Sequence, residues 1–262
     1  MVPSAAERRL AVITGASAGL GKVFAQKLAA QGFDVVLVAR DAQRLEVLAA
    51  ELAVAHGIHA EAWPADLGNR DAVNGIVARL KAAPRVDMLV NNAGFGTQGA
   101  LAKTDAAGQE QMIEVHVMAT NRLTQAALPG MLARKTGTII NVSSVASFTA
   151  TEGNVNYCAT KAYLRVFSEA LALECKGRGV TVQALCPGFT YTEFHDRLGF
   201  DRGNVPKMLW MSADRVIDES LAAVAAGGPV VVVPGKRYKA LVWGIKYAAW
   251  ALAPLRKSHR RD

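Results

Sequence analysis

Short apolar runs alternate with longer amphipathic stretches along the first 235 residues of the chain. The runs are four to seven residues long and almost free of charge. This pattern is typical of strands that are buried on both faces of a sheet. We therefore predict seven strands, at residues 10–14, 34–39, 59–65, 86–91, 138–142, 181–186 and 230–233.

The amphipathic stretches between the strands show helical spacing and contain many good helix formers. They predict helices around residues 22–31, 43–56, 71–81, 109–134 and 156–176. Strands that alternate with helices form βαβ units, and their crossovers are right-handed. The expected fold class is α/β, a three-layer doubly wound parallel β-sheet of about seven strands, which is a Rossmann fold.

The composition is that of one large globular domain, with 262 residues, 51% hydrophobic and 20% charged. The three cysteines follow no motif, so neither a disulfide scaffold nor a metal site is expected. The N-terminus passes from two arginines into a five-residue apolar run, which is too short for the core of a signal peptide. We expect a cytoplasmic protein.

The net charge of +8 is concentrated at the C-terminus. Residues 236–262 carry eight basic side chains and one acidic side chain, whereas residues 1–235 carry 22 basic and 21 acidic side chains. The body of the protein is therefore nearly neutral, and the tail is strongly basic.

A glycine-rich turn, residues 14–21 (TGASAGLG), separates the first strand from the first helix. Glycines let a backbone turn tightly and approach a pyrophosphate, whose charge then faces the helix N-terminus. The alternative is a plain tight connection between a strand and a helix.

The spacing of this turn, TGxxxGxG, resembles that of the short-chain dehydrogenase/reductase family. Four further marks of that family follow in order: Asp66-Leu67, the NNAG sequence at residues 91–94, Ser144 with Tyr157-x-x-x-Lys161, and Pro187-Gly188. The resemblance covers about residues 8–235. It implies a dinucleotide-binding and catalytic domain over residues 1–235, and hydride transfer between a nicotinamide and a carbonyl or alcohol carbon.

The resemblance also implies which residues bind the dinucleotide. Asp66 would contact adenine, although an Asp between a strand and a helix is as often an N-cap. Asn91 is expected to be structural. The full expected set is Gly15, Ser17, Gly19, Leu20, Gly21, Arg40, Asp66, Leu67, Asn92, Ala93, Gly94, Tyr157, Lys161, Pro187, Gly188, Thr190 and Thr192.

The end of the second strand indicates which dinucleotide is used. An acidic residue there accepts hydrogen bonds from the ribose of NAD, whereas a basic residue accommodates the 2′-phosphate of NADP. The position of the family's acidic residue is Ala39, and Arg40 follows it, with Ser17 as a hydroxyl partner. NADP(H) is therefore favoured over NAD(H). The alternative is that Arg40 caps a helix or pairs with Asp41 or Glu46.

Tyr157 and Lys161 are four residues apart in a predicted helix and so share one face. A free phenol has a pKa of about 10 and transfers protons well at neutral pH only when cations stabilise its phenolate. The resemblance implies that Tyr157 is the acid/base, that Lys161 lowers its pKa and binds the ribose, and that Ser144 orients the substrate. Ser143 is the adjacent alternative to Ser144.

His116 departs from the family pattern, which commonly has Asn at this position. In the family that Asn marks a helix irregularity whose carbonyl holds a water linked to the lysine. We name His116 as a candidate catalytic residue. The alternatives are that it interrupts the proton relay, or that it is a histidine satisfied among the helices.

Residues 189–212 match the family's substrate lid, and loops of this type exclude water when they close. Their large apolar residues predict an apolar ketone, aldehyde or secondary alcohol, unless several of them only pack on the core: Phe194, Leu198, Phe200, Met208, Leu209, Trp210 and Met211. A 3-oxoacyl-thioester reductase and a steroid or other lipid alcohol dehydrogenase fit equally well. A catalytically weak dinucleotide sensor or adaptor is a further alternative.

The tail, residues 236–262, is predicted to be helical over 238–253, with Trp243, Tyr247 and Trp250 on one face. Sixteen residues are short for a spanning helix, which needs about 20. The tail fits either peripheral contact with anionic lipid through residues 238–262 or docking on its own or a neighbouring subunit. We expect a homodimer or homotetramer that forms through helices 109–134 and 156–176. We expect no nucleic acid partner.

Overall fold

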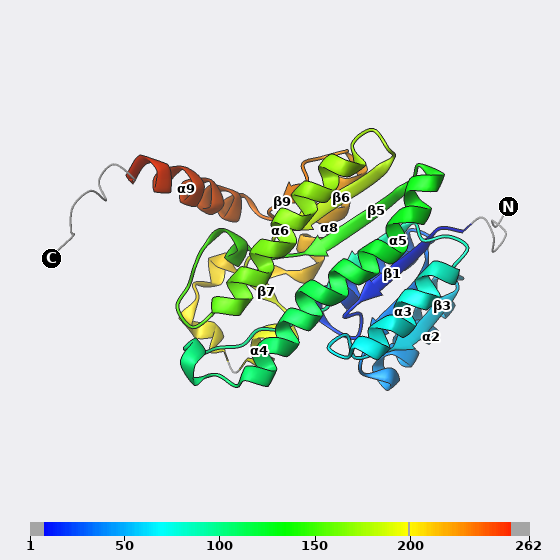
Figure 1. Cartoon of the computed structure of the whole chain (residues 1–262), viewed down its shortest axis with the longest axis horizontal. Coiled ribbons are helices and arrows are strands. Elements are labelled where there is room, and N and C mark those ends of the chain that lie inside the picture. Colours follow the sequence, from blue (N-terminus) through cyan, green and yellow to red (C-terminus); the bar gives the residue numbers. More distant parts are fainter. Residues whose placement is uncertain (1–7, 199, 253–262) are drawn as a thin grey trace.

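The computed structural model describes residues 8–198 and 200–252. Its main sheet has seven strands in the order β3-β2-β1-β4-β5-β6-β9, and every neighbouring pair is parallel (Figure 1). The prediction of a doubly wound parallel sheet is thus confirmed. The strands are β1 (Leu10–Thr14), β2 (Asp34–Ala39), β3 (Ala60–Pro64), β4 (Met88–Asn91), β5 (Gly137–Val142), β6 (Val180–Leu185) and β9 (Val231–Val232).

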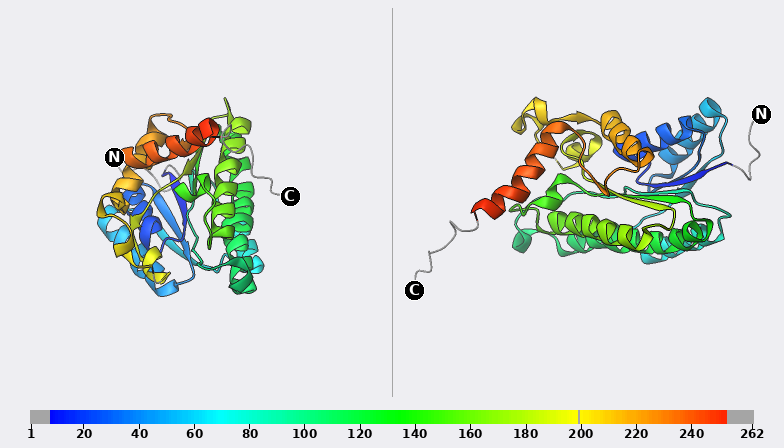
Figure 2. Two further views of the ribbon diagram at one scale, coloured as in Figure 1. Left: turned by 90° about the vertical axis from the view of Figure 1, so that its left-hand side faces the viewer. Right: turned by 90° about the horizontal axis from the view of Figure 1, so that it is seen from above.

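Helices cover both faces of this sheet (Figure 2). One face packs against α1 (Gly19–Ala30), α2 (Ala42–His56) and α8 (Ala213–Ala225). The other packs against α3 (Arg70–Ala82), α5 (Thr120–Arg134) and α6 (Val155–Cys175). Alternate residues of β1 belong to different cores, since Ala11 and Ile13 face the first layer and Val12 faces the second. Burial on both faces explains why the strands are continuous apolar runs.

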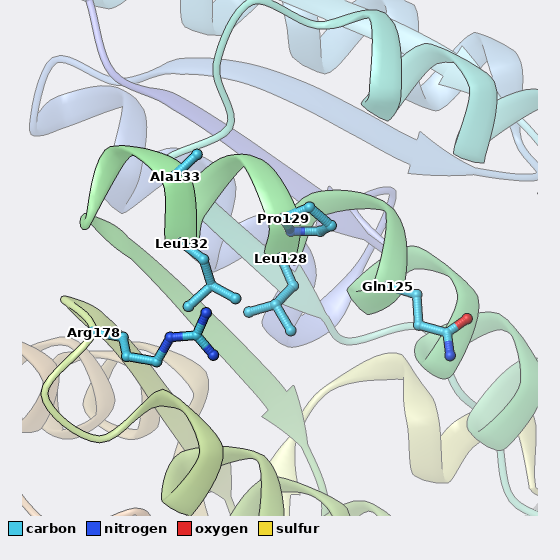
Figure 3. Close-up of a pocket in the computed structure, with 6 residues that line it drawn as sticks. All are labelled: Gln125, Leu128, Pro129, Leu132, Ala133 and Arg178. Carbon is cyan, nitrogen blue, oxygen red and sulfur yellow. The ribbon is translucent and has the colours of Figure 1, made fainter.

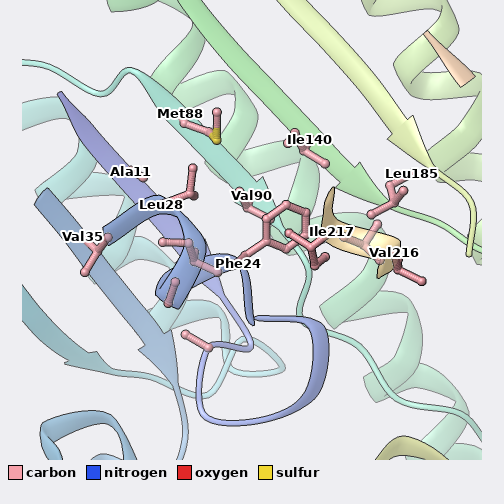
Figure 4. Close-up of a cluster of buried hydrophobic side chains, with 14 of the residues drawn as sticks. Ala11, Phe24, Leu28, Val35, Met88, Val90, Ile140, Leu185, Val216 and Ile217 are labelled. Atoms are coloured by element: carbon pink, nitrogen blue, oxygen red, sulfur yellow. The ribbon is translucent and has the colours of Figure 1, made fainter. Parts of the chain in front are cut away.

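The first core fills the space between the sheet and helices α1 and α8 (Figure 4). Phe24 and Leu28 of α1 meet Val216 and Ile217 of α8 there, and all four are fully buried. Each such side chain contributes about 1.5–3 kcal/mol of transfer free energy on burial. This packing fixes α1, and with it the turn that precedes it.

The predicted helix at 109–134 is interrupted. The chain forms α4 (Ala106–Ile113), a π-helical segment (Glu114–Ala119) and then α5. A π-helical turn holds an extra residue, so it shifts the phase of a 3.6-residue pattern, and such turns often lie at functional sites. Further short elements were not predicted: β7 (Thr190–Tyr191), α7 (Glu193–Arg197), β8 (Met211–Ser212), and 3₁₀ turns at Leu101–Lys103, Val145–Phe148, Arg202–Asn204 and Lys207–Leu209.

The C-terminal helix α9 (Lys236–Leu252) extends away from the sheet (Figure 2). Its first turns are docked, because Tyr238 and Val242 are buried in the first core. Farther along, Leu241, Trp243 and Tyr247 are exposed, and the Trp243 and Tyr247 rings lie 5.1 Å apart. The basic residues of the tail beyond position 252 lie outside the described residues.

No helix of the described chain has the length and apolar character needed to cross a bilayer. The predicted contact of the tail with lipid stays a prediction.

The winding of the chain reverses between β1 and β4, which are paired neighbours in the sheet. The connections that follow these two strands cross opposite faces of the sheet. Ligands of doubly wound sheets bind at the carboxyl ends of the strands at such a switch point. The glycine turn follows β1 and the NNAG segment begins at the end of β4, so both motifs lie at this switch point.

Candidate active site

The glycine turn has the geometry that a phosphate requires. Gly15 and Gly19 have φ angles of +65° and +56°, which favour glycine, and a Cβ on Gly21 would overlap the Gly15 carbonyl oxygen. In the part of the chain that the structure describes, no side chain caps the first turn of α1, whereas Asp41 caps α2 and Asn69 caps α3. The amides at the start of α1, around Leu20, thus have no side-chain acceptor among these residues.

The NNAG segment holds this turn in place. The Asn92 side chain donates to the carbonyl oxygens of Thr14 (2.9 Å) and Gly15 (3.3 Å). The Thr14 hydroxyl accepts from the amides of Asn92 and Ala93 at 2.9 and 3.0 Å. Asn91 is buried and donates to Asn141 (2.8 Å), so it is structural, as predicted.

Arg40 lies exposed at the end of β2, and no ion pair or hydrogen bond joins it to Asp41 or Glu46 in the described structure. Asp41 instead caps α2 through the amide of Arg44 (3.0 Å). The alternative roles considered for Arg40 are therefore not observed.

Asp66 is not an N-cap either. Its carboxylate accepts from the amide of Gly68 at 2.9 Å, while Asn69 caps α3, and Leu67 beside it is buried. Arg40 and Asp66 thus lie beyond the carboxyl ends of β2 and β3, which are neighbours in the sheet.

Ser144, Tyr157 and Lys161 come together beyond β5. Tyr157 and Lys161 lie on α6, with the Lys161 Nζ 5.8 Å from the centroid of the Tyr157 ring. The Ser144 side chain lies next to the Tyr157 phenol and favours its ionised form. Ser143 points elsewhere, because its buried hydroxyl donates to the Lys161 carbonyl at 2.7 Å. The geometry therefore favours Ser144 over Ser143 as the hydroxyl that faces Tyr157.

Burial dominates the acid-base properties of this group. It raises the pKa of Tyr157 to about 12, and the Ser144 side chain only partly opposes the rise. It lowers the pKa of Lys161 from 10.5 to about 8. The resemblance implied that Lys161 lowers the pKa of Tyr157. In the protein alone, burial is the largest effect on this phenol, and it raises the pKa.

His116 lies in the π-helical segment and is completely buried. Its Nε2 accepts from the amide of Phe95 at 3.0 Å. Its Nδ1 lies 2.9 Å from the Thr160 hydroxyl, which itself donates to the Tyr157 carbonyl at 3.1 Å. Nδ1 must therefore carry the hydrogen, and both ring nitrogens are engaged.

The surroundings keep this imidazole neutral. Burial, and then the nearby Lys161 ammonium, lower the pKa of His116 well below its ordinary 6.5. A Cβ on Gly94 would lie 2.8 Å from the His116 Nε2 and 3.4 Å from the Lys161 Nζ, so the three residues pack closely. The irregular helix is present as the resemblance implied, and the histidine is satisfied within it.

A row of rings leads from this group to the lid. The ring centroids are 5.8 Å apart for Phe95 and His116, 6.2 Å for His116 and Tyr157, and 6.0 Å for Tyr157 and Phe194. Leu198 and Phe194 also approach Gly96 closely. The lid thus covers Tyr157 with apolar side chains. Trp210 and Met211, by contrast, are buried, and Met211 packs in the first core, which is the alternative considered for part of this set.

Residues after β6 form the root of the lid. Pro187 is buried, the Thr190 hydroxyl donates to the Gly188 carbonyl at 3.0 Å, and Thr192 lies against Gly19 of the glycine turn. The ring of Tyr238 occupies the space where a Cβ on Gly188 would be.

Sequence reasoning missed Tyr238. Its hydroxyl accepts from the Phe189 amide at 2.9 Å and donates to the Leu209 carbonyl at 2.7 Å, so one side chain from α9 joins both ends of the lid. No motif signals this contact, since it links residues 49 and 29 positions apart.

A separate shallow groove of about 560 Å³ lies on α5 (Figure 3). Neither Ser144, Tyr157 nor Lys161 lines it. It is lined by Gln125, Leu128, Pro129, Leu132, Ala133 and Arg178. The predicted oligomer contacts involve this region, and they stay a prediction.

The site fits a dinucleotide. The buried Lys161 ammonium has three N–H donors, and the described structure gives it one acceptor, the Val142 carbonyl at 2.9 Å. Its remaining donors suit the hydroxyls of a ribose, and the uncapped start of α1 suits a pyrophosphate. No cluster of His, Cys, Asp and Glu among the described residues could hold a metal ion.

Comparisons with known proteins agree with this geometry. Residues 9–202 match the short chain dehydrogenase family. The chain is 40% identical over 191 residues to nodulation protein G of Rhizobium sp. (strain N33), covering 72% of this chain and 76% of that protein. It is 32% identical over 186 residues to the 3-oxoacyl-(acyl-carrier-protein) reductase of Aquifex aeolicus (strain VF5), covering 71% and 75%.

A solved structure shares almost the whole fold. The short-chain dehydrogenase from Sphingobium yanoikuyae in complex with NADPH is 34% identical and superposes with a TM-score of 0.85. The match covers 97% of this chain and 99% of that one, so it includes most of α9. The chain therefore belongs to the short-chain dehydrogenase/reductase family, whose NAD(P)-binding oxidoreductases interconvert CH–OH and C=O groups.

Proposed function

We propose that this protein is an NADP(H)-dependent reductase of apolar ketones or aldehydes, with Tyr157 as the acid/base. The observation that carries the proposal is the cluster of partly buried Ser144 and Tyr157 with buried Lys161, next to an apolar lid. The dinucleotide supplies the hydride that is added to the carbonyl carbon.

The protonation state of the free site supports reduction as the working direction. A phenol with a pKa of about 12 is neutral at physiological pH, and it is the neutral form that can donate a proton to a carbonyl oxygen. In the proposed reaction the Ser144 hydroxyl donates a hydrogen bond to that oxygen. Tyr157 transfers its proton there as the new C–H bond forms, and Lys161 holds the ribose and stabilises the phenolate that remains.

The apolar lid supports the proposed substrate class. The Phe194 ring packs on Tyr157, and Phe194 and Leu198 both lie close to Gly96. A site of this kind binds an apolar group by burial and leaves one polar atom, the carbonyl oxygen, to Ser144 and Tyr157.

Two residues support the choice of NADP(H). Arg40 is exposed at the end of β2 and forms no ion pair with another described residue, and Ser17 lines a cavity of about 390 Å³ next to the glycine turn. A guanidinium and a hydroxyl suit the 2′-phosphate. We propose Arg40→Ala as the test, with NADPH affinity expected to fall about tenfold and NADH affinity to stay within about twofold.

The decisive experiment is Tyr157→Phe. We expect loss of NADPH oxidation with every carbonyl in a panel of aryl ketones and medium-chain aldehydes, while NADPH still binds as measured by fluorescence titration. The variant lacks only the hydroxyl, so the ring contacts with His116 and Phe194 persist. Unchanged turnover in this variant would refute the proposed mechanism.

A second candidate is reduction of a 3-oxoacyl thioester, which the similarity to the Aquifex aeolicus reductase favours. The two candidates differ in the size and polarity of the group beyond the carbonyl. Comparing kcat/KM for a 3-oxoacyl thioester with that for a free ketone of equal chain length distinguishes them.

A further inference from the structure

The Arg44 side chain joins the cofactor half of the protein to the lid. It extends from the first turn of α2 to Glu193 at the start of α7, with its Nη1 at 3.1 and 3.3 Å from the two carboxylate oxygens. The side chains of the two residues are 52% and 49% exposed, so the pair faces solvent. Asp41 adds a second, longer contact, 3.4 Å from the Arg44 Nε.

This ion pair lies beside the glycine turn. Arg44 and Glu193 line the same cavity of about 390 Å³ as Ser17, Gly19 and Lys22. Thr192, the residue before Glu193, packs against the position that a Cβ on Gly19 would take, at 3.3 Å. The lid root, the phosphate-binding turn and a second arginine therefore meet at one place.

The Arg44–Glu193 pair is weak compared with what a phosphate offers. Exposed ion pairs contribute little free energy, because water solvates both partners and both side chains lose conformational freedom. A phosphate monoester carries a charge of about −1.5 to −2 and has three acceptor oxygens, which match the fork of donors on a guanidinium. An arginine in this position therefore gains free energy by exchanging a solvated carboxylate for a phosphate.

We propose that Arg44 exchanges Glu193 for the 2′-phosphate of NADP(H), and that this exchange releases α7 from the cofactor half of the protein. NAD(H) lacks this phosphate and leaves the pair intact. Arg44 is then a specificity-determining residue in addition to Arg40, and Glu193 is the intramolecular competitor for it. The inference rests on the proposed preference for NADP(H).

A double-mutant cycle of Arg44→Ala and Glu193→Gln tests the exchange, with calorimetric titration of adenosine 2′,5′-bisphosphate and of AMP, which lacks the 2′-phosphate. We expect Arg44→Ala to weaken bisphosphate binding about tenfold and AMP binding by less than about twofold. We expect Glu193→Gln to strengthen bisphosphate binding about threefold, because the competitor is gone. In the Arg44→Ala background, Glu193→Gln should then have no effect.

Two outcomes overturn the proposal. If Arg44→Ala leaves bisphosphate binding unchanged, Arg44 does not contact the phosphate. If Glu193→Gln is equally effective with and without Arg44, the carboxylate acts by long-range repulsion and no exchange occurs. Glu51→Gln is the matched control, since Glu51 lines the same cavity and no described ion pair joins it to Arg44.

The effect on the lid has its own readout. Hydrogen exchange of the amides of residues 190–198 should be faster with bisphosphate than with AMP in the native protein, and already faster without ligand in Glu193→Gln. Equal exchange with the two nucleotides would contradict the release of α7.

The failure of this inference can be told apart from that of the proposed cofactor preference. Equal affinity of the native protein for NADPH and NADH would refute the preference itself. A native preference for NADPH that survives in Arg44→Ala would refute only the exchange.

Discussion

Lys161 Nζ lies 5.8 Å from the centroid of the Tyr157 ring, one helical turn away, and burial shifts the two pKa values in opposite directions. Desolvation favours the neutral form of each side chain, so the phenol holds its proton more tightly and the ammonium releases its proton more easily. The protein alone therefore does not favour the ionised pair, which is a Tyr157 phenolate with a Lys161 ammonium. A cofactor that accepts hydrogen bonds from Lys161 and places a positive charge near Tyr157 would reverse both shifts.

Lys161→Met is expected to stabilise the cofactor-free protein at pH 7 and to abolish activity. The pKa of Lys161 is about 8 when folded and 10.5 ordinarily, so between these values the unfolded chain binds more protons and stability rises with pH. This contribution is fully present above pH 10.5 and is lost as pH falls to 8. Methionine removes the buried charge at similar volume, and the midpoint of thermal unfolding at pH 7 should increase by a few degrees.

The measurement is thermal or urea unfolding of both proteins at pH 7.0, 8.0, 9.0 and 9.5, below the range in which Tyr157 titrates. The stability difference between them should shrink as pH rises. Lys103→Met, at an exposed position, serves as the control. A constant difference across this range would show that Lys161 is not the group responsible.

His116→Asn should leave the shape of the pH profile unchanged. The imidazole is neutral with both nitrogens engaged, so it has no proton to exchange with the substrate. The Asn side chain cannot reach both partners, and a buried donor left unpaired costs about 1–3 kcal/mol of stability. The test is kcat from pH 5.5 to 9 together with the unfolding midpoint.

His59→Asn, an exposed histidine, controls for the loss of an imidazole as such. The opposite result would be a limb near pH 6.5 in the native profile that disappears in His116→Asn. That result would restore His116 as an acid/base group.

Much of the fold and of the site was predictable for two physical reasons. Strands buried on both faces must be apolar throughout, so β1 and β2 were identified to the residue. The carboxyl ends of parallel strands share one edge, so the motifs after β1, β4 and β5 had to meet there.

The features that the sequence could not predict depend on contacts between residues that are far apart in the chain. Tyr238 reaches Gly188 and Phe189 across 50 residues, and its place at the lid root has no local signal. The same holds for Arg44, whose partner Glu193 lies 149 residues away. The direction of the Tyr157 shift depends on burial, which residue spacing does not report.

Tyr238→Phe should impair the substrate step more than cofactor binding. The hydroxyl accepts from the Phe189 amide and donates to the Leu209 carbonyl, so its loss removes one hydrogen bond from each end of the lid. We expect the KM for the carbonyl substrate to rise several-fold and the affinity for NADPH to stay within about twofold. Steady-state kinetics and fluorescence titration measure the two effects.

Tyr247→Phe on the same helix is the control, because this ring is exposed and packs on Trp243. If the two variants behave alike, the lid does not depend on the Tyr238 hydroxyl. Truncation after residue 235 would remove Tyr238 and so damage the lid. A test of lipid binding by α9 should instead substitute Trp243 and Tyr247.

Two glycine-to-alanine changes should have opposite consequences. In Gly21→Ala the new methyl group would overlap the Gly15 carbonyl oxygen and crowd the Asn92 amide, so the phosphate-binding turn must open. NADPH affinity should fall at least about tenfold. In Gly75→Ala, within α3, the methyl group meets nothing within 4 Å, and alanine should stabilise the helix by about 0.5–1 kcal/mol.

Both variants are measured by NADPH titration and by urea unfolding. The pair separates backbone fit at the cofactor turn from the general effect of replacing a helical glycine, since Gly21 is the third residue of α1 and Gly75 is the sixth residue of α3. Normal NADPH binding by Gly21→Ala would mean that the turn can widen without loss, and that the tight approach of Gly21 to Gly15 is not what shapes the phosphate site.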